Sequence, residues 1–378
     1  MKKEVHLYNG DSLDILEKMD TNNSHNNFFD AVISSPPYSY EIVSSKKDFR
    51  MKGINNETEY IERTIKYFKH FDKVVKKNGL VIWNLSYFND NPGLPIKTIS
   101  SIMNEKDLNW TLIDTISWFK NSYIKDMYEK EGIGARLGRT VELIFIFARK
   151  NTDEDIEKDS TIKHWKSSYK IHPTDTRVNY IDTSQKGKQL DDVLKEASKN
   201  IGCPTTATYA ESLITELLNI YKSGERINKQ PWVNILDPFA GTGTTGVVCM
   251  KQNLNFYGME IDSKCVASMV YRFRQLKSDK YDIYVDEELC TKDESIIKTD
   301  KKRKRVSKKC EEINKAITYG LVGPESEKRI IKKPSLFSSL FSPIKPLDGK
   351  RKSKNIKSKK RRSKKRRSKK SIKNKKKN

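Results

Sequence analysis

The chain has 378 residues and a formal net charge of +25 at pH 7, and its length allows one large domain or two small ones. The charge is uneven, because residues 345–378 carry 20 Lys and Arg residues against one acidic residue, so the body is only mildly basic. The longest apolar run, residues 143–148, is too short to cross a bilayer, and the polar start of the chain has no secretory signal. These features argue against a membrane protein and predict a soluble, intracellular one.

The cysteines give no sign of a metal site. None of the five forms a C-x-x-C pair, and only five histidines are available as further ligands. We therefore predict no bound metal and a reducing compartment. That compartment is the cytoplasm or, because residues 301–306 resemble a nuclear import signal, the nucleus of a eukaryotic or viral system.

The first part of the chain alternates between strand-like and helix-like patterns. Five apolar or β-branched runs are predicted strands, residues 4–8, 29–34, 80–85, 110–119 and 140–147. Three amphipathic runs are predicted helices, residues 13–19, 59–75 and 96–103. The polar, charged run 39–56 is a predicted loop, and so is the basic run 120–139.

The second part continues the alternation after residues 150–202, which lose all clear periodicity. Strands are predicted at residues 233–237 and 255–259, and helices at residues 206–221, 247–251 and 265–276. Alternating strands and helices predict an α/β domain with a largely parallel sheet over residues 1–277. Residues 278–344 read as a polar linker, and the Lys/Arg-rich tail 345–378 is too charged to fold alone.

A glycine-rich turn follows the strand at 233–237, in the run Val-Asn-Ile-Leu-Asp-Pro-Phe-Ala-Gly-Thr-Gly-Thr-Thr-Gly. Gly241 and Gly243 permit a sharp bend and close approach to a ligand, and the helix start that follows favours an anionic group. Glu260 lies 23 positions after Asp237, where a nucleotide-binding fold places its ribose-binding acid. Taken alone, this spacing also fits a nicotinamide site or a turn without any ligand.

A second motif, Ser35-Pro36-Pro37-Tyr38, follows the strand at 29–34. The two prolines stiffen an extended segment and lack N–H donors, so the segment presents mainly carbonyl acceptors. Ser35 adds a hydroxyl acceptor and Tyr38 an aromatic face. This combination suits an amine on a flat heterocycle, although a simple strand exit with a packing tyrosine also explains it.

Together the two motifs resemble those of the S-adenosylmethionine-dependent amino-methyltransferases of DNA. Their order is that of the circularly permuted β group, and the resemblance covers residues 5–276. It implies a Rossmann-like class I methyltransferase sheet, mostly parallel with one antiparallel strand, and S-adenosylmethionine as cofactor. In this family a leading Ser goes mainly with cytosine N4 and a leading Asp or Asn with adenine N6, so Ser35 implies cytosine N4. A nicotinamide enzyme has no use for the Ser-Pro-Pro-Tyr turn.

The resemblance also implies roles for single residues. In the catalytic segment Ser35, Pro36, Pro37 and Tyr38, the Ser35 hydroxyl and the Pro36 carbonyl would accept the amine N–H bonds, and Tyr38 would stack on a flipped base. Asp11 would lie near the cofactor adenine, Asp237 and the turn near the methionine portion, and Glu260 at the ribose. The implied cofactor-binding residues are Asp11, Thr205, Thr206, Asp237, Phe239, Ala240, Gly241, Thr242, Gly243, Thr244, Thr245 and Glu260.

Duplex DNA is the predicted partner. Residues 120–139 and 150–202 are candidates for sequence readout, and the tail would bind phosphates without sequence preference. A cognate restriction endonuclease sharing the recognition site is a further implied partner. Two other readings stay open, adenine N6 as the target and a non-catalytic nucleic-acid binder on the same fold. The recognition sequence, the oligomeric state and an RNA substrate are also left open.

Overall fold

A computed structural model describes residues 2–21, 25–38, 54–86, 91–120, 141–158, 178–183, 195, 201, 203, 208–222, 231–276 and 280–286. All of them belong to the first of the two units into which the chain divides, Met1–Leu340. The expectations for Thr205, Thr206, the basic tail and most of residues 120–139 and 150–202 lie outside the described residues.

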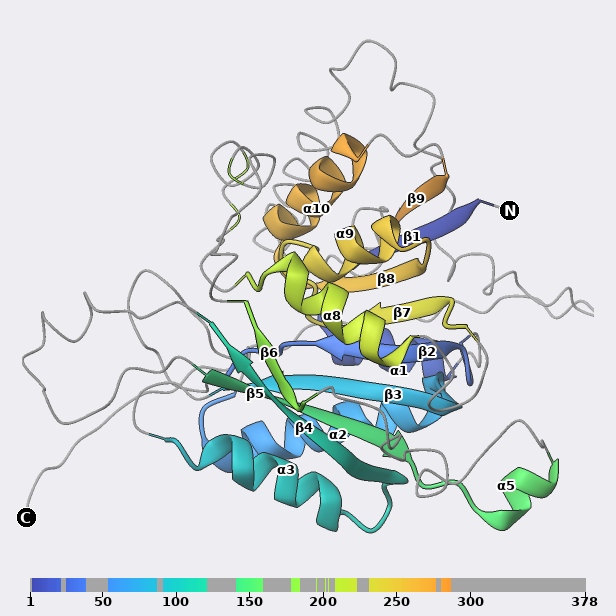
Figure 1. The fold of residues 1–378 in the computed structure, drawn as a ribbon, viewed down its shortest axis with the longest axis vertical. Helices are drawn as coiled ribbons and strands as arrows, with labels where there is room; N and C mark the ends of the chain where they lie inside the picture. The colour runs from blue at the N-terminus through green and yellow to red at the C-terminus, as the bar shows by residue number, and fades with distance from the viewer. Residues whose placement is uncertain are drawn as a thin grey trace, which may run out of the picture. The chain divides into compact units, whose positions relative to one another are not determined.

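The described part of the chain is built on one sheet of nine strands (Figure 1). In chain order these are β1 Lys3–Asn9, β2 Phe29–Ser34, β3 Val75–Leu85, β4 Trp110–Phe119, β5 Val141–Arg149, β6 Tyr180–Asp182, β7 Asn234–Asp237, β8 Asn255–Glu260 and β9 Tyr281–Asp286. Their order in the sheet is β6-β4-β5-β3-β2-β7-β8-β1-β9. Only the pairs β3–β5 and β4–β5 are antiparallel. The expected sheet, mostly parallel with one antiparallel strand, is confirmed.

Two layers of helices cover the sheet (Figure 1). On one face lie α1 Ser12–Thr21, α2 Glu57–Val74 and α3 Leu94–Asn104, and on the other α8 Glu211–Tyr221, α9 Thr244–Lys251 and α10 Ser263–Gln275. A short helix, α5 Asp153–Lys158, carries no buried residue. All six residues of β2 are buried, as expected for a parallel strand covered on both faces.

A local signal in the sequence explains where α2 begins. The Asn56 side chain accepts from Glu59 N–H at 2.9 Å and caps α2.

Most predicted elements lie within a few residues of their predicted bounds. The strands β6 and β9 were not predicted. β9 pairs in parallel with β1 and extends the sheet to Asp286, beyond the last predicted helix.

The fold brings the ends of distant segments to one edge of the sheet. The carboxyl ends of β1, β2, β3, β7 and β8 meet there, because these strands are parallel. The antiparallel strand β5 starts at the same edge, where Leu143 pairs with Leu85 at the end of β3. Both sequence motifs, after β2 and after β7, therefore lie at this edge.

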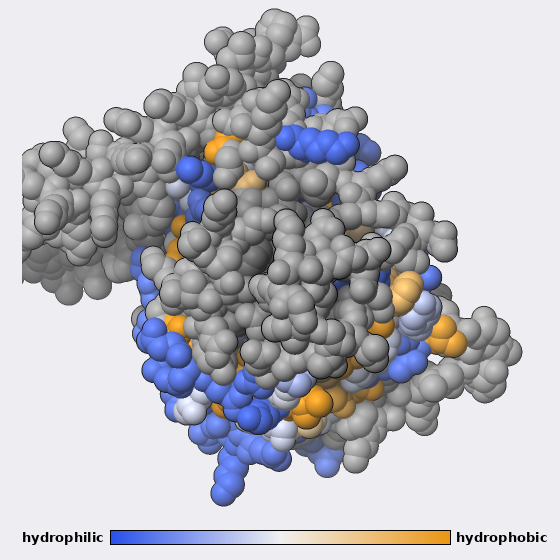
Figure 2. Space-filling view, turned by 90° about the vertical axis from the view of Figure 1, so that its left-hand side faces the viewer, coloured by the Kyte–Doolittle hydropathy of each residue, from blue (hydrophilic) through white to orange (hydrophobic). Residues whose placement is uncertain are grey.

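The surface of the described ranges shows no sign of a membrane segment. None of their helices combines the length and the apolar character that crossing a bilayer requires. On the face shown in Figure 2, hydrophilic side chains predominate among the described residues, and hydrophobic ones form smaller areas.

Candidate active site

The two sequence motifs are joined by a direct hydrogen bond. Ser34, the last residue of β2, donates from its hydroxyl to Asp237 Oδ1 at the end of β7, and the distance is 2.6 Å. Both side chains are buried. Because Ser35 follows Ser34 and the glycine turn follows Asp237, this bond holds the Ser-Pro-Pro-Tyr segment beside the glycine turn. Ser34 also lines a small cavity together with Asn84 of β3 and Tyr209.

Asp237 supports the turn from beneath. It is 0% exposed, and its carboxylate accepts from Ser34, from the Tyr209 hydroxyl at 3.1 Å, from Thr245 Oγ1 at 2.6 Å and from Phe239 N–H at 3.1 Å. Burial raises the pKa of Asp237, and these hydrogen bonds oppose the rise. With four donors around it, the carboxylate holds the start of the turn and the start of α9 in place.

The glycine turn has the backbone geometry that the sequence indicated. Gly241 and Gly243 have φ values of +53° and +78°, in the left-handed region that favours glycine. Apart from the residues next to it in the chain, no atom of the described residues lies within 4 Å of the position that a Cβ on Gly241 would take, so this part of the structure leaves the turn open there. At Gly243 a Cβ would lie 2.6 Å from Met269 Cγ of α10. Gly241 therefore leaves room for a ligand, whereas Gly243 allows the close packing of the turn on α10.

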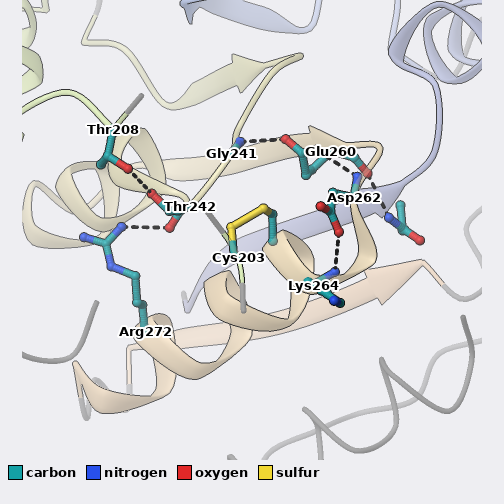
Figure 3. Close-up of a disulfide and its surroundings, with 10 residues drawn as sticks. Cys203, Thr208, Gly241, Thr242, Glu260, Asp262, Lys264 and Arg272 are labelled. Carbon is teal, nitrogen blue, oxygen red and sulfur yellow. Dashed lines mark hydrogen bonds between the residues drawn. A yellow bond between two sulfur atoms is a disulfide. The ribbon is translucent and has the colours of Figure 1, made fainter. Parts of the chain in front are cut away.

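The rest of the turn is tied to its neighbours. Ala240 N–H donates to the Met259 carbonyl at 2.9 Å, and the Phe239 ring packs edge-on against Tyr67 of α2. The Thr242 carbonyl accepts from Arg272 Nη1 at 2.7 Å (Figure 3). Thr244 and Thr245 begin α9 and are buried.

Glu260 ends β8 next to the turn (Figure 3). Its Oε2 accepts from Gly241 N–H at 2.9 Å, and its Oε1 accepts from Asp262 N–H at 2.8 Å. Burial raises the pKa of Glu260 to about 7. The carboxylate is thus held at the turn in a fixed orientation, and each oxygen keeps further acceptor capacity.

Asp11 follows β1 at the same edge. Its Oδ1 accepts from Leu13 N–H at 3.0 Å at the start of α1, and both of its oxygens accept from Arg63 Nη2 of α2 at 2.7 and 2.6 Å. About a quarter of the side chain is exposed. Arg63 was not predicted, because its contact depends on the packing of α2 beside α1.

The catalytic segment is partly buried and internally hydrogen-bonded. The hydroxyls of Ser35 and Tyr38 are 2.5 Å apart, and the Pro37 carbonyl accepts from the Tyr60 hydroxyl of α2 at 2.9 Å. Burial, reinforced by the nearby charge of Glu142, raises the pKa of Tyr38 well above its usual range. The phenol is therefore protonated at neutral pH and can donate one hydrogen bond.

A disulfide lies beside the cofactor turn. Cys203 is bonded to Cys265 of α10, 62 positions later, close to the segment that carries Glu260 and Asp262 (Figure 3). From the sequence we expected a reducing compartment and paired no cysteines, because no short spacing linked them. Among the described residues, no group of His, Cys, Asp or Glu side chains could hold a metal ion.

The sequence pattern of the DNA methylase family matches residues 29–271, which is more than half of the chain. This chain belongs to the DNA methylase family. The match includes both motifs and the strands that carry them.

Three DNA methylases illustrate the likeness. The type II methyltransferase M.MwoI of Methanothermobacter wolfeii is 26% identical over 247 residues, which are 62% of this chain and 29% of that protein. The chain therefore matches less than a third of that relative. The structure of the PvuII DNA methyltransferase (cytosine-N4-specific) has a TM-score of 0.52 at 16% identity and covers 84% of this chain and 95% of its own, which shows a shared fold. A putative DNA modification methylase from Thermus thermophilus, complexed with S-adenosyl-L-methionine, has a TM-score of 0.44 at 16% identity, with 74% and 97% covered.

Several polar residues of this DNA methylase site were missed from the sequence. Asn84 at the end of β3 donates from Nδ2 to the Tyr38 hydroxyl at 2.8 Å and to Glu142 Oε2 at 2.9 Å. Glu142 near the start of β5 accepts from the Tyr38 hydroxyl at 3.1 Å and contacts Lys120 Nζ. Tyr209, just before α8, bonds Asp237. The sequence signal that could have identified Asn84 and Glu142 is a polar side chain at the end of an otherwise apolar strand.

Proposed function

We propose that this chain is a DNA methyltransferase that transfers a methyl group from S-adenosylmethionine to the N4 amine of cytosine. The observation that carries the proposal is the Ser34–Asp237 hydrogen bond, which holds the catalytic segment beside the glycine turn. Family membership supports the general chemistry. The leading Ser35 favours cytosine N4 over adenine N6, because in the family that residue goes mainly with N4.

The amine must be made nucleophilic and brought to the methyl donor. Its lone pair is delocalised into the ring, and the base lies inside the duplex, so it has to be flipped out at a cost of a few kcal/mol. The Ser35 hydroxyl and the Pro36 carbonyl accept the two N–H bonds, which draws the nitrogen toward tetrahedral geometry. The Tyr38 ring stacks on the base, a contact worth about 1–3 kcal/mol.

S-adenosylmethionine supplies a methyl group that is already activated on a sulfonium, so catalysis consists mainly of positioning and electrostatic stabilisation. Glu260 would accept from the ribose hydroxyls and Asp11 would lie near the adenine. The open backbone at Gly241 gives the methionine portion room, and Asp237 holds that backbone in place.

DNA binding and partners extend the proposal. Residues 120–139 and 150–202 would read the DNA sequence, and the tail from residue 345 would contact phosphates. The curated relative is named a type II methyltransferase, which supports the proposal of a cognate restriction endonuclease that shares the site.

The test is incubation with labelled S-adenosylmethionine and duplex DNA, followed by nucleoside analysis. N4-methylcytosine supports the proposal, N6-methyladenine corrects the target, and DNA binding without label in the DNA indicates a non-catalytic binder. Ser35→Ala should lower turnover by about 100-fold while cofactor binding changes little, because the hydroxyl acts on the amine. Equal loss of turnover and of cofactor binding would contradict its role.

A further inference from the structure

We propose that Glu142 is a positioning residue, which sets through Tyr38 the direction in which the Ser35 hydroxyl points its proton. The inference rests on the proposed function, since it concerns the acceptor that meets the substrate amine. Glu142 is 6% exposed, and its side chain contacts Lys120, Asn84 and Tyr38.

The antiparallel strand brings Glu142 to the site. Because β5 runs against its neighbours, its second residue lies at the edge where β3 and β4 end. There Glu142 pairs with Trp118 of β4, and the next residue pairs with Leu85 of β3. A parallel strand would have placed its start, and this acid, at the opposite edge.

The partners of Glu142 define the direction of the hydrogen bonds. Among the described residues its carboxylate contacts three donors, the Lys120 ammonium at Oε1 and both the Asn84 amide and the Tyr38 hydroxyl at Oε2. The Tyr38 hydroxyl has one proton, which it gives to Glu142. The Ser35 hydroxyl, 2.5 Å from the Tyr38 oxygen, must then donate to it.

When Ser35 donates to Tyr38 and Tyr38 donates to Glu142, the Ser35 oxygen can act as the acceptor for the substrate amine. A serine hydroxyl has one proton and two lone pairs. With the proton directed at Tyr38, the lone pairs of the Ser35 hydroxyl stay available to accept from the amine N–H of the base. Asn84 Nδ2 lies 3.3 Å away, farther than from Tyr38 and Glu142, to which its two protons are directed. If the order were reversed, Ser35 would point its proton at the amine and could not accept from it.

The substitution Glu142→Gln is expected to reverse the order. Lys120 is a donor only, so the glutamine carbonyl turns toward Lys120, and the amide NH2 turns toward Tyr38 and displaces Asn84 Nδ2, the other donor at that position. The Tyr38 hydroxyl then accepts from the amide and donates to Ser35. We expect kcat to fall by about 100-fold, a loss typical of a misdirected hydrogen bond in a site, while the Kd for S-adenosylmethionine stays within about twofold.

A second substitution should undo the first. Without the ammonium, the amide of residue 142 is free to turn its carbonyl toward Asn84 and Tyr38, which restores the original order. Glu142→Gln combined with Lys120→Met should therefore recover most of the lost kcat. Tyr38→Phe removes the link, so Glu142→Gln should change kcat little in that background.

The experiment measures kcat on duplex DNA and the Kd for S-adenosylmethionine in these variants. Asp114→Asn is the control, because Asp114 on β4 is a carboxylate that also accepts from a tyrosine hydroxyl, that of Tyr221 at 3.4 Å, away from the site. It should leave kcat unchanged. A selective loss in Glu142→Gln, with recovery in the Lys120→Met combination, supports the inference.

Other outcomes overturn it. Wild-type kcat in Glu142→Gln, no recovery in the combination with Lys120→Met, or the same fold loss in the Tyr38→Phe background would each refute a role through Tyr38. Loss of cofactor binding in Glu142→Gln would show a structural role instead. A wild-type chain that transfers no methyl group would overturn the proposed function and this inference together, whereas an active wild type with an equally active Glu142→Gln overturns the inference alone.

Discussion

Ser34→Ala tests whether the hydrogen bond between the two motifs stabilises the fold. The Ser34 hydroxyl donates to Asp237 Oδ1 at 2.6 Å, and Ser34 is 3% exposed. The substitution leaves that oxygen with Phe239 N–H, at 3.1 Å. A hydrogen bond to a charged group contributes about 1.5–3 kcal/mol, so the free energy of unfolding should fall by about that amount at neutral pH.

The loss should depend on pH with a definite sign. Burial raises the pKa of Asp237 in the folded state, and the Ser34 bond opposes this because it favours the carboxylate. Without the bond the folded pKa rises further above its unfolded value, so stability falls more steeply as the pH rises and the carboxyl group ionises. The difference between Ser34→Ala and the wild type should be small in acid and largest at neutral pH.

The assay is urea denaturation followed by circular dichroism, at neutral and at acidic pH, with Ser268→Ala as the control. Ser268 of α10 is 0% exposed, and its hydroxyl has no hydrogen-bond partner among the described residues. Removing such a hydroxyl should be close to neutral. If Ser34→Ala and Ser268→Ala lose the same stability, or if the loss is independent of pH, the reasoning is refuted.

Three further predictions concern the cofactor turn and its surroundings. Burial raises the pKa of Glu260 to about 7, and ribose hydroxyls donate best to a carboxylate, so S-adenosylmethionine should bind more weakly below about pH 7 and binding should release a proton. Calorimetry in two buffers of different ionisation enthalpy measures this proton release. If Glu260→Gln still releases the proton, Glu260 is not its source. Gly241→Ala should weaken cofactor binding and lower the free energy of unfolding by only about 1 kcal/mol, whereas Gly243→Ala, whose Cβ would overlap α10, should lower that free energy more. Thermal melts in which Gly241→Ala is the less stable variant would contradict the packing described for the two glycines. Reducing the Cys203–Cys265 disulfide, with 62 positions between its ends, should lower stability by about 4 kcal/mol in the chain-entropy description, and identical melts with and without reductant would show that the bond contributes nothing.

The sequence predicted the central elements well, because their signals are local. β2 and its neighbours read as continuous apolar runs, since parallel strands are buried on both faces. β9 was missed although Tyr281, Ile283 and Val285 alternate along it. Its stability comes from main-chain pairing with β1, which is distant in sequence and leaves no local signal.

The residues of the proposed site were predicted in part for a related reason. Ser35, Tyr38 and the turn stand out in the sequence because they follow strands directly. Glu142 was not predicted, because it lies at the start of its strand and not after the end of one. Only the antiparallel direction of β5 brings that start to the same edge as Tyr38. The place of Asp237 after its strand was predictable, whereas the burial of its side chain beneath the turn was not.

The end of β2 lies where two hydrogen-bond networks meet, one buried and one partly buried. Ser34 donates to Asp237, which holds the cofactor turn, and Ser35 bonds Tyr38, which leads to Glu142 on the antiparallel side of the sheet. Two consecutive residues are thus fixed from opposite halves of the sheet by separate carboxylates. The position of Ser35 relative to the turn is therefore set by contacts with β3, β5 and β7. Under the proposed function, these contacts fix the alignment on which methyl transfer depends, and readout of the DNA sequence falls to residues outside them.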